Sequence, residues 1–315
     1  DPIQYDVRIE EMFRDACRLA DKDVNFSDYN YVYIFFAGYS EAEGGAEESI
    51  WPMSISLQDD PVVLDGSRIV NFSCSAELRG NSGEMPAGIG AFCHEFGHLL
   101  GFRDLYDVDY KENGQSKGLW GSLSLMDYGC YNNQGRTPPY LCAIELESLG
   151  VEPIQIGVGK YNLPPIQQKK FYKIITRNEN EYFLFESRGN EKWDSYIGGE
   201  GMLVYHIDKS EESAGMITAS VRWETNTVNT YALHECADLV EAVSDASNIK
   251  QVFFPGLENV TRFTVLTEPH FIDWNLISTG YKLTAIKQLS EGVSFNLEFD
   301  KDEYLLIPQN PKVRS

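Results

Sequence analysis

The segment His94-Glu95-Phe96-Gly97-His98 places two histidines four residues apart, with a glutamate directly after the first. On a helix such positions lie on one face about one turn apart, so both imidazoles can bind a single ion. Glu95 would point to the side, where it can hold a metal-bound water and act as general base. With five histidines in 315 residues, chance would produce this HExxH pattern roughly 0.01 times. The pattern therefore favours a catalytic metal site over a solvated helix face.

The residues after the second histidine predict a third metal ligand. Gly101 can adopt the left-handed conformation that ends a helix and turns the chain sharply. This turn would bring Asp104 back towards the ion, and the ligands would then be His94, His98 and Asp104. Two histidines and one carboxylate leave a fourth tetrahedral position for water, as in catalytic zinc sites. An anionic ligand strengthens metal binding but makes the bound water less acidic, so Glu95 must carry more of the proton abstraction.

A methionine and a tyrosine follow in Ser124-Leu125-Met126-Asp127-Tyr128, which resembles the methionine turn of metzincins. We predict that Met126 forms a hydrophobic floor beneath the metal and that Tyr128 donates a hydrogen bond to the developing oxyanion. Taken alone, such a pair is more often ordinary core. After HExxHxxGxxD, the functional interpretation is favoured, although metzincins usually have histidine at the position of Asp104.

The helices and strands that must position these residues are predicted from the spacing of apolar residues and from the positions of glycine and proline. Residues 9–20 have apolar side chains at helical spacing, and residues 31–37 form a short β-branched and aromatic run typical of a buried strand. A second helix is predicted from Pro86, which would lie in its first turn, to the residues before Gly101.

A further strand is predicted over residues 68–76, where polar and apolar residues alternate. Such a strand beside a cleft could add a substrate through backbone hydrogen bonds, a mode indifferent to side chains. We therefore predict Arg68, Val70 and Phe72 as a substrate-binding edge strand.

The character of the chain changes beyond Gly150, where short strand-like runs alternate with Gly, Asn and Asp. These runs are 171–176, 182–186, 202–207, 263–266 and 293–299. They predict an all-β, sandwich-like domain over residues 151–315. Together with a catalytic domain over residues 1–150, the fold class is predicted to be α+β.

The composition excludes several classes of partner. A formal charge of −22 repels phosphate backbones and anionic lipid surfaces, so we expect no nucleic acid or membrane partner. No run of about 18 apolar residues exists, so no transmembrane segment is predicted. The six cysteines show no zinc-knuckle spacing and allow either disulfides or scattered buried thiols.

Asp107, Asp109 and Glu112 bring oxygen ligands together directly after the predicted third zinc ligand. These three residues could bind calcium. They do not match the twelve-residue calcium loop, so a solvated acidic loop is the alternative. The remaining histidines, His206, His234 and His270, are predicted to be structural residues with hydrogen-bond partners.

Four segments resemble the immune inhibitor A-type metalloproteases, a family of secreted bacterial enzymes in the metzincin clan. The matching segments are 94–107 (HEFGHLLGFRDLYD), 120–126 (WGSLSLM), 143–150 (AIELESLG) and 201–208 (GMLVYHID). The resemblance implies a zinc endopeptidase that acts on proteins or peptides, with calcium in some members. It also implies secretion from, or attachment to, a bacterial cell.

By position, the resemblance makes His94, His98 and Asp104 the zinc ligands and Glu95 the base. It implies a metzincin-like zincin catalytic domain followed by the β-rich domain. It further implies strands of the catalytic sheet, and a propeptide, upstream of the helix at residues 9–20. We therefore expect this chain to be a piece of a longer polypeptide.

Two alternatives remain open from the sequence. One is a binding or adhesion protein with a vestigial zinc site, which the intact Glu95 argues against because a structural metal needs no adjacent base. The other is a zinc peptidase with Glu145 or Glu147 as third ligand. Gly101 and Asp104 disfavour it, since that class needs no sharp turn after the helix.

Overall fold

The computed structural model describes residues 8–83, 85–109, 112 and 114–307. The chain forms two compact units, residues 1–102 with 134–136, and residues 103–133 with 137–315. Both α-helices and several β-sheets are present. The chain is therefore of mixed α and β structure, in agreement with the predicted α+β class. The predicted division into a catalytic domain (1–150) and an all-β domain (151–315) stays a prediction.

The first unit is built on a three-stranded sheet in the order β1 (Val32–Tyr39), β5 (Asn71–Leu78), β2 (Met53–Ser56). β5 pairs in parallel with β1 and antiparallel with β2. The short strands β3 (Val62–Leu64) and β4 (Ser67–Ile69) form a separate antiparallel hairpin. β1 matches the strand predicted at 31–37, but its side chains are mostly half-exposed rather than buried.

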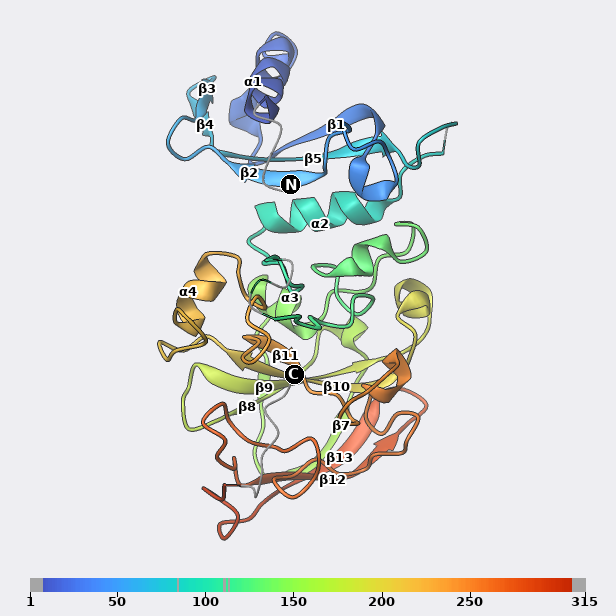
Figure 1. Cartoon of the computed structure of the whole chain (residues 1–315), viewed down its shortest axis with the longest axis vertical. Coiled ribbons are helices and arrows are strands. Elements are labelled where there is room, and N and C mark those ends of the chain that lie inside the picture. The colour runs from blue at the N-terminus through green and yellow to red at the C-terminus, as the bar shows by residue number, and fades with distance from the viewer. Residues whose placement is uncertain (1–7, 84, 110–111, 113, 308–315) are drawn as a thin grey trace. The chain divides into compact units, whose positions relative to one another are not determined.

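One face of this sheet is covered by α1, Ile9–Ala20, whose bounds are those predicted from the sequence (Figure 1). The rings of Phe13 and Phe72 stack with centroids 3.9 Å apart, and neither side chain is exposed. Cys74 and Ala76 continue the same buried cluster along β5. Alternate residues of β5 therefore form the core beneath α1.

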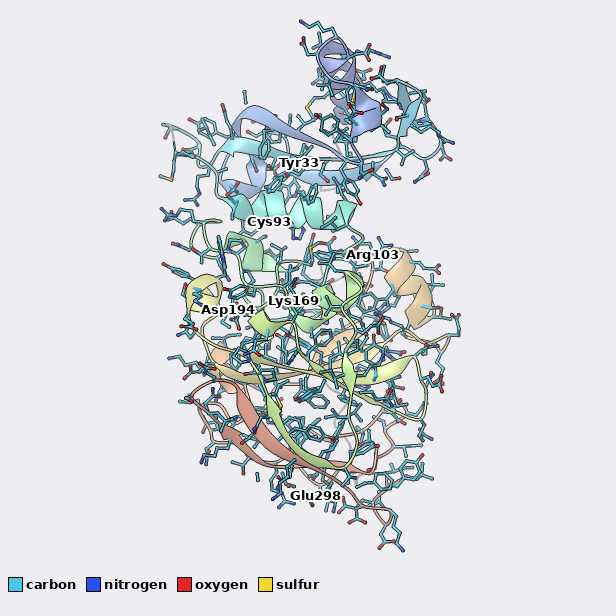
Figure 2. All side chains as sticks on the ribbon, turned by 180° about the vertical axis from the view of Figure 1, so that it is seen from behind. Tyr33, Cys93, Arg103, Lys169, Asp194 and Glu298 are labelled. Atoms are coloured by element: carbon cyan, nitrogen blue, oxygen red, sulfur yellow. The ribbon has the colours of Figure 1, made fainter. Side chains whose placement is uncertain are left out.

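The other face of the sheet is covered by α2, Ile89–Leu99 (Figure 1). Tyr33 of β1 lies on this face, with its ring centroid 4.7 Å from that of Phe92 (Figure 2). The helix begins after Gly88, so the prediction that Pro86 lies in its first turn is wrong. Pro86 instead forms a bridge with Leu78 at the end of β5.

The prediction of a substrate-binding edge strand at Arg68, Val70 and Phe72 is wrong. The structure has two strands in place of the predicted one, because Val70 belongs to neither β4 nor β5. Arg68 pairs with Val63 in the hairpin. β5 is the central strand of its sheet and Phe72 is fully buried, so its backbone groups are already paired with β1 and β2.

The second unit contains two larger sheets. A five-stranded sheet has the order β11-β10-β9-β8-β6, and a three-stranded sheet has the order β12-β13-β7. Their bounds are β6 Ile154–Gln155, β7 Gly159–Leu163, β8 Tyr172–Ile175, β9 Glu181–Arg188, β10 Gly201–Asp208, β11 Ala237–Leu239, β12 Tyr281–Gln288 and β13 Val293–Phe299. Two short helices, α3 (Ala143–Ser148) and α4 (Ala219–Glu224), belong to the same unit.

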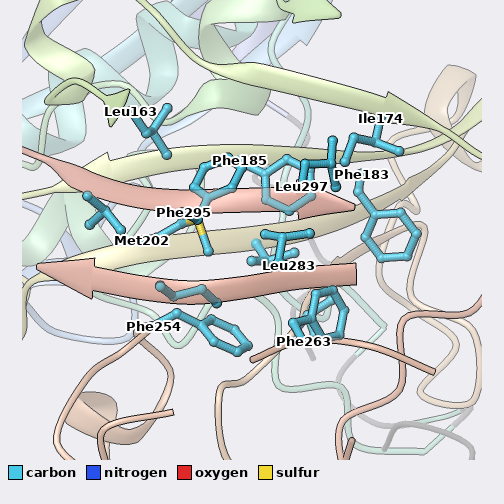
Figure 3. Packing of buried hydrophobic residues seen from close by; sticks show 14 of the residues in the cluster. Leu163, Ile174, Phe183, Phe185, Met202, Phe254, Phe263, Leu283, Phe295 and Leu297 are labelled. Atoms are coloured by element: carbon cyan, nitrogen blue, oxygen red, sulfur yellow. The ribbon is translucent and has the colours of Figure 1, made fainter. Parts of the chain in front are cut away.

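The two sheets of the second unit share one apolar core (Figure 3). Phe183 and Phe185 of β9 contribute to it from the larger sheet, and Phe295 and Leu297 of β13 from the smaller one. Four of the predicted strands correspond to β8, β9, β10 and β13. The fifth, predicted at residues 263–266, is wrong as a strand, because Phe263 and Thr264 form only isolated bridges.

None of the six cysteines, all of which lie within the described residues, forms a disulfide, and five of them are buried. Their side chains therefore act as small core residues, which is one of the two alternatives left by the sequence. Within the described part of the chain, no helix is both long and apolar enough to cross a membrane.

A cavity of the second unit is lined by five carboxylates, Glu235, Asp238, Glu241, Asp245 and Glu268. Burial, followed by the charge of Asp238, raises the pKa of Glu235 to about 8. The folded state then binds more protons than the unfolded state between the ordinary value of 4.5 and about 8. The free energy of unfolding should therefore fall as the pH rises through this window.

We expect Glu235→Gln to weaken this pH dependence, because an amide has no proton to lose. At pH 9 the variant should be more stable than the wild type by about 1–3 kcal/mol, while at pH 4 the two should be similar. Urea unfolding of metal-free protein measures both values, with the exposed Glu200→Gln as matched control. A variant that is less stable than the wild type at pH 9 would contradict the raised pKa.

Candidate metal centre

The end of α2 is a Schellman turn centred on Gly101. Gly101 has φ +96°, and its N–H donates to the carbonyl of His98 at 3.0 Å. The N–H of Phe102 donates to the carbonyl of Gly97, also at 3.0 Å. These two bonds are the pattern by which a left-handed glycine satisfies the last carbonyls of a helix. The predicted sharp turn after the second histidine is confirmed.

The same turn orients the ring of His98. Its Nδ1 lies 3.1 Å from the carbonyl oxygen of Phe102. Because a carbonyl only accepts hydrogen bonds, Nδ1 carries a proton, and in the neutral ring Nε2 has the lone pair. Metal-binding histidines commonly have their second nitrogen fixed in this way. His98 is therefore held in the tautomer that can bind a cation through Nε2.

His94, His98 and Asp104 offer ligand atoms that all lie within 4.8 Å of one another. The rings of the two histidines are nearly perpendicular, at 89°, with centroids 5.0 Å apart. His94 and Asp104 are buried and His98 is half-buried. Two imidazoles and a carboxylate suit a small divalent cation such as zinc, whose bonds to these groups are about 2.0–2.2 Å long. This cluster could bind a metal.

Glu95 lies between the two histidines in sequence and is only 7% exposed. The hydroxyl of Ser73 in β5 donates to the backbone carbonyl of Glu95 at 2.8 Å. This bond attaches the ligand-bearing helix to the central strand of its sheet. The backbone of the predicted base is thereby fixed relative to β5.

Asp104 is held by a residue that the sequence analysis did not single out. Asn226 Nδ2 donates to Asp104 Oδ2 at 2.6 Å, and the N–H of Asp104 donates to Asn226 Oδ1 at 2.7 Å. The two residues are 122 positions apart. An asparagine after a short helix carries no signal that would associate it with a distant aspartate. Sequence reasoning could not have found it.

The predicted methionine turn is anchored by its backbone. The carbonyl of Met126 accepts from the N–H of Leu105 at 2.9 Å, and its N–H donates to Glu145 Oε1 at 3.0 Å. Met126 is fully buried. The carboxylate of Asp127 accepts from the N–H groups of Leu119 and Tyr128, at 2.8 and 2.7 Å. The turn is thus joined to the residue directly after Asp104.

Tyr128 begins a single 3₁₀ turn, Tyr128–Tyr131, and its side chain is 60% exposed. Its ring lies 5.6 Å from that of Tyr106. An exposed phenol on a short turn can change rotamer at little cost, which is what the predicted oxyanion donor would need.

The acidic residues after Asp104 cap their own loop. Asp107 accepts from the N–H groups of Asp109 and Ser116, both at 3.3 Å, and Asp109 accepts from the N–H of Glu112 at 3.1 Å. Burial raises the pKa of Asp107. Tyr110, Lys111 and Asn113 of the same segment lie outside the described residues. Calcium binding by Asp107, Asp109 and Glu112 stays a prediction.

The two glutamates proposed as alternative third ligands have other partners. Glu145 accepts from the hydroxyl of Ser124 at 2.6 Å and from the N–H of Cys142 at 2.7 Å, in addition to Met126. Glu147 accepts from the hydroxyl of Tyr182 and from Lys209 Nζ. Both carboxylates therefore stabilise the fold through hydrogen bonds to other residues.

The other three histidines have the structural contacts that were predicted. His206 Nε2 lies 2.7 Å from Glu181, His234 Nε2 lies 2.8 Å from Asp208, and His270 Nδ1 lies 2.9 Å from the carbonyl of Val265. Trp274 stacks between His206 and His234, with ring centroids 5.1 and 4.0 Å away.

Comparison with known proteins supports the resemblance seen in the motifs. Residues 20–143 match the family model described as immune inhibitor A peptidase M6, catalytic domain. A curated protein named immune inhibitor A, from Bacillus thuringiensis subsp. alesti, is 26% identical over 108 residues. That alignment covers 30% of this chain and 15% of the relative.

The matched segment contains the HExxH helix, the turn at Gly101, Asp104 and the methionine turn. The chain spans only a small part of the length of the curated relative. Over residues 20–143, the chain is thus similar to the catalytic domain of the immune inhibitor A peptidases, the family that its motifs indicated.

Proposed function

We propose that this chain is a zinc-dependent endopeptidase that hydrolyses peptide bonds in proteins, with Glu95 as general base. The observation that carries the proposal is the grouping of His94, His98 and Asp104, whose ligand atoms lie within 4.8 Å of one another. A buried carboxylate directly follows the first ligand, and the similarity to a peptidase catalytic domain supports the same chemistry.

His94, His98 and Asp104 would hold the metal through two neutral nitrogens and one carboxylate oxygen. When bound, zinc would polarise the scissile carbonyl and lower the pKa of a coordinated water to about 7. The protonated Nδ1 of His98 supports this role, because it leaves Nε2 as the only ligand atom of that ring.

Glu95 would accept the proton of the attacking water at its carboxylate and return it to the leaving amine. Its low exposure favours proton transfer over exchange with bulk solvent. The bond from Ser73 to its backbone carbonyl limits rotation of the helix beneath it. A base that is fixed in this way loses little entropy when the substrate binds.

Met126 and Tyr128 would complete the site as its floor and as donor to the oxyanion. The bonds from Leu105 and Glu145 to the backbone of Met126 support a fixed position for the floor. The exposure of Tyr128 supports a side chain that moves when substrate binds. Calcium at Asp107, Asp109 and Glu112 would further stiffen the loop that follows Asp104.

We further propose a metzincin-like zincin catalytic domain followed by a sandwich-like β domain. Secretion from, or attachment to, a bacterial cell and synthesis with a propeptide are proposed from the family resemblance. A binding or adhesion protein with a vestigial zinc site is not favoured, because it gives no role to the buried Glu95.

The central test is Glu95→Gln, which keeps the shape of the side chain but cannot take a proton. We expect one zinc per chain in wild type and variant, and a loss of proteolysis by about 10²–10⁴-fold in the variant. Zinc content is measured by mass spectrometry, and cleavage on an unfolded protein substrate. Glu200→Gln is the matched control at an exposed position. Equal cleavage by wild type and Glu95→Gln would refute the mechanism.

The identity of the third ligand is tested by comparing Asp104→Ala with Glu145→Gln. We expect Asp104→Ala to weaken zinc binding by more than about 10-fold, because one of three ligands is lost. Glu145→Gln should keep its zinc but lower the melting temperature, since Glu145 holds three buried donors. Titration against a chelator and thermal unfolding measure the two effects. Loss of zinc only in Glu145→Gln would reverse the assignment.

A further inference from the structure

The proposed third ligand, Asp104, is hydrogen-bonded to a residue in the C-terminal half of the chain. Asp104 belongs to the compact unit formed by residues 103–133 and 137–315. Its N–H and its carboxylate both bond to Asn226, at 2.7 and 2.6 Å. Asn226 lies beyond residues 20–143, which are the ones that match the peptidase catalytic domain.

A second asparagine of the same loop holds the next residue. Asn229 Nδ2 donates to the carbonyl of Leu105 at 2.9 Å and to that of Ala237, the first residue of β11, at 3.0 Å. The N–H of Ala237 returns a bond to Asn229 Oδ1 at 3.0 Å. Asn229 is fully buried. It ties the ligand segment to an edge of the five-stranded sheet.

The loop that carries the two asparagines is itself fixed. Arg222 of α4 is 1% exposed and donates to the carbonyls of Thr227, Ala214 and His234, at 3.0, 2.9 and 2.6 Å. Asn226 has φ +59°, a left-handed conformation that asparagine tolerates better than most residues. The backbone that carries Asn226 therefore has little conformational freedom, and this fixes the direction of its amide towards Asp104.

We infer that Asn226 and Asn229 are positioning residues for the third metal ligand, an inference that rests on the proposed zinc site. A neutral amide that donates to one carboxylate oxygen fixes the rotamer of Asp104. Unlike a lysine or arginine, it brings no positive charge that would compete with the metal ion for the carboxylate. Groups that orient a metal ligand in this way commonly contribute 10–100-fold to metal affinity. Residues outside the segment that matches the catalytic domain thus take part in metal binding, by orienting a ligand without supplying one.

Asn226→Gly tests the inference, because glycine keeps the left-handed backbone while removing the amide. We expect the zinc dissociation constant to rise by about 10–100-fold, measured by competition with a chromophoric chelator. The absorption bands of the cobalt-substituted protein should shift as well, since they report ligand geometry. Asn259→Gly is the matched control, because Asn259 is exposed and also left-handed, at φ +54°. Its zinc affinity and cobalt spectrum should equal those of the wild type.

Folding of the metal-free variants is followed by circular dichroism, and Asn226→Ser serves if Asn226→Gly does not fold. Folded variants with wild-type zinc affinity would overturn the inference, as would an equal loss of affinity in Asn259→Gly. Failure of both position-226 variants to fold without metal would make Asn226 a structural residue, which also overturns it. A wild-type chain that binds no zinc would instead refute the proposed function itself.

Discussion

The turn at Gly101 is the constraint on which the candidate metal centre depends. Apart from its two chain neighbours, no described residue has an atom within 4 Å of where a Cβ at this position would lie, so space is not limiting. The requirement is conformational, because φ +96° is a region that residues with a Cβ rarely adopt. The same turn presents the carbonyl of Phe102 to His98 Nδ1. One backbone conformation therefore ends the helix, selects the tautomer of a ligand and directs the chain to Asp104.

A second constraint is a buried charged cluster beneath the methionine turn. Arg188 of β9 is fully buried between Glu186 and Asp194, and it also donates to the carbonyls of Leu123 and Tyr140. Glu186 accepts from the N–H of Ala143, at the start of α3. Buried charges are tolerated only when they are paired, and removal of one partner typically costs about 3–5 kcal/mol. The segment around Met126 is thus attached to the sheet by bonds that tolerate little displacement.

The sequence was most informative where the cause of a structure lies in adjacent residues. The bounds of α1 and the turn at Gly101 follow from periodicity and capping, which act over a few positions. The edge strand was mispredicted because alternation describes which face of a strand is covered and says nothing about its neighbours. Whether Phe72 lies on a central or an edge strand depends on the pairing of β5 with residues 32–36 and 53–56. The local pattern of polar and apolar residues does not specify that pairing.

The same distinction explains why the ligands were found and their supports were not. His94, His98 and Asp104 fall within eleven residues, so the geometry of one helix and of the turn that ends it relates them. Asn226 and Asn229 approach that segment only because α4 and β11 fold beside it, across 122 and 124 positions. A boundary drawn at residue 150 from changes in composition separates the ligand from its supports. The contacts of Asp104 and Leu105 place the ligand segment in the same compact unit as Asn226 and Asn229.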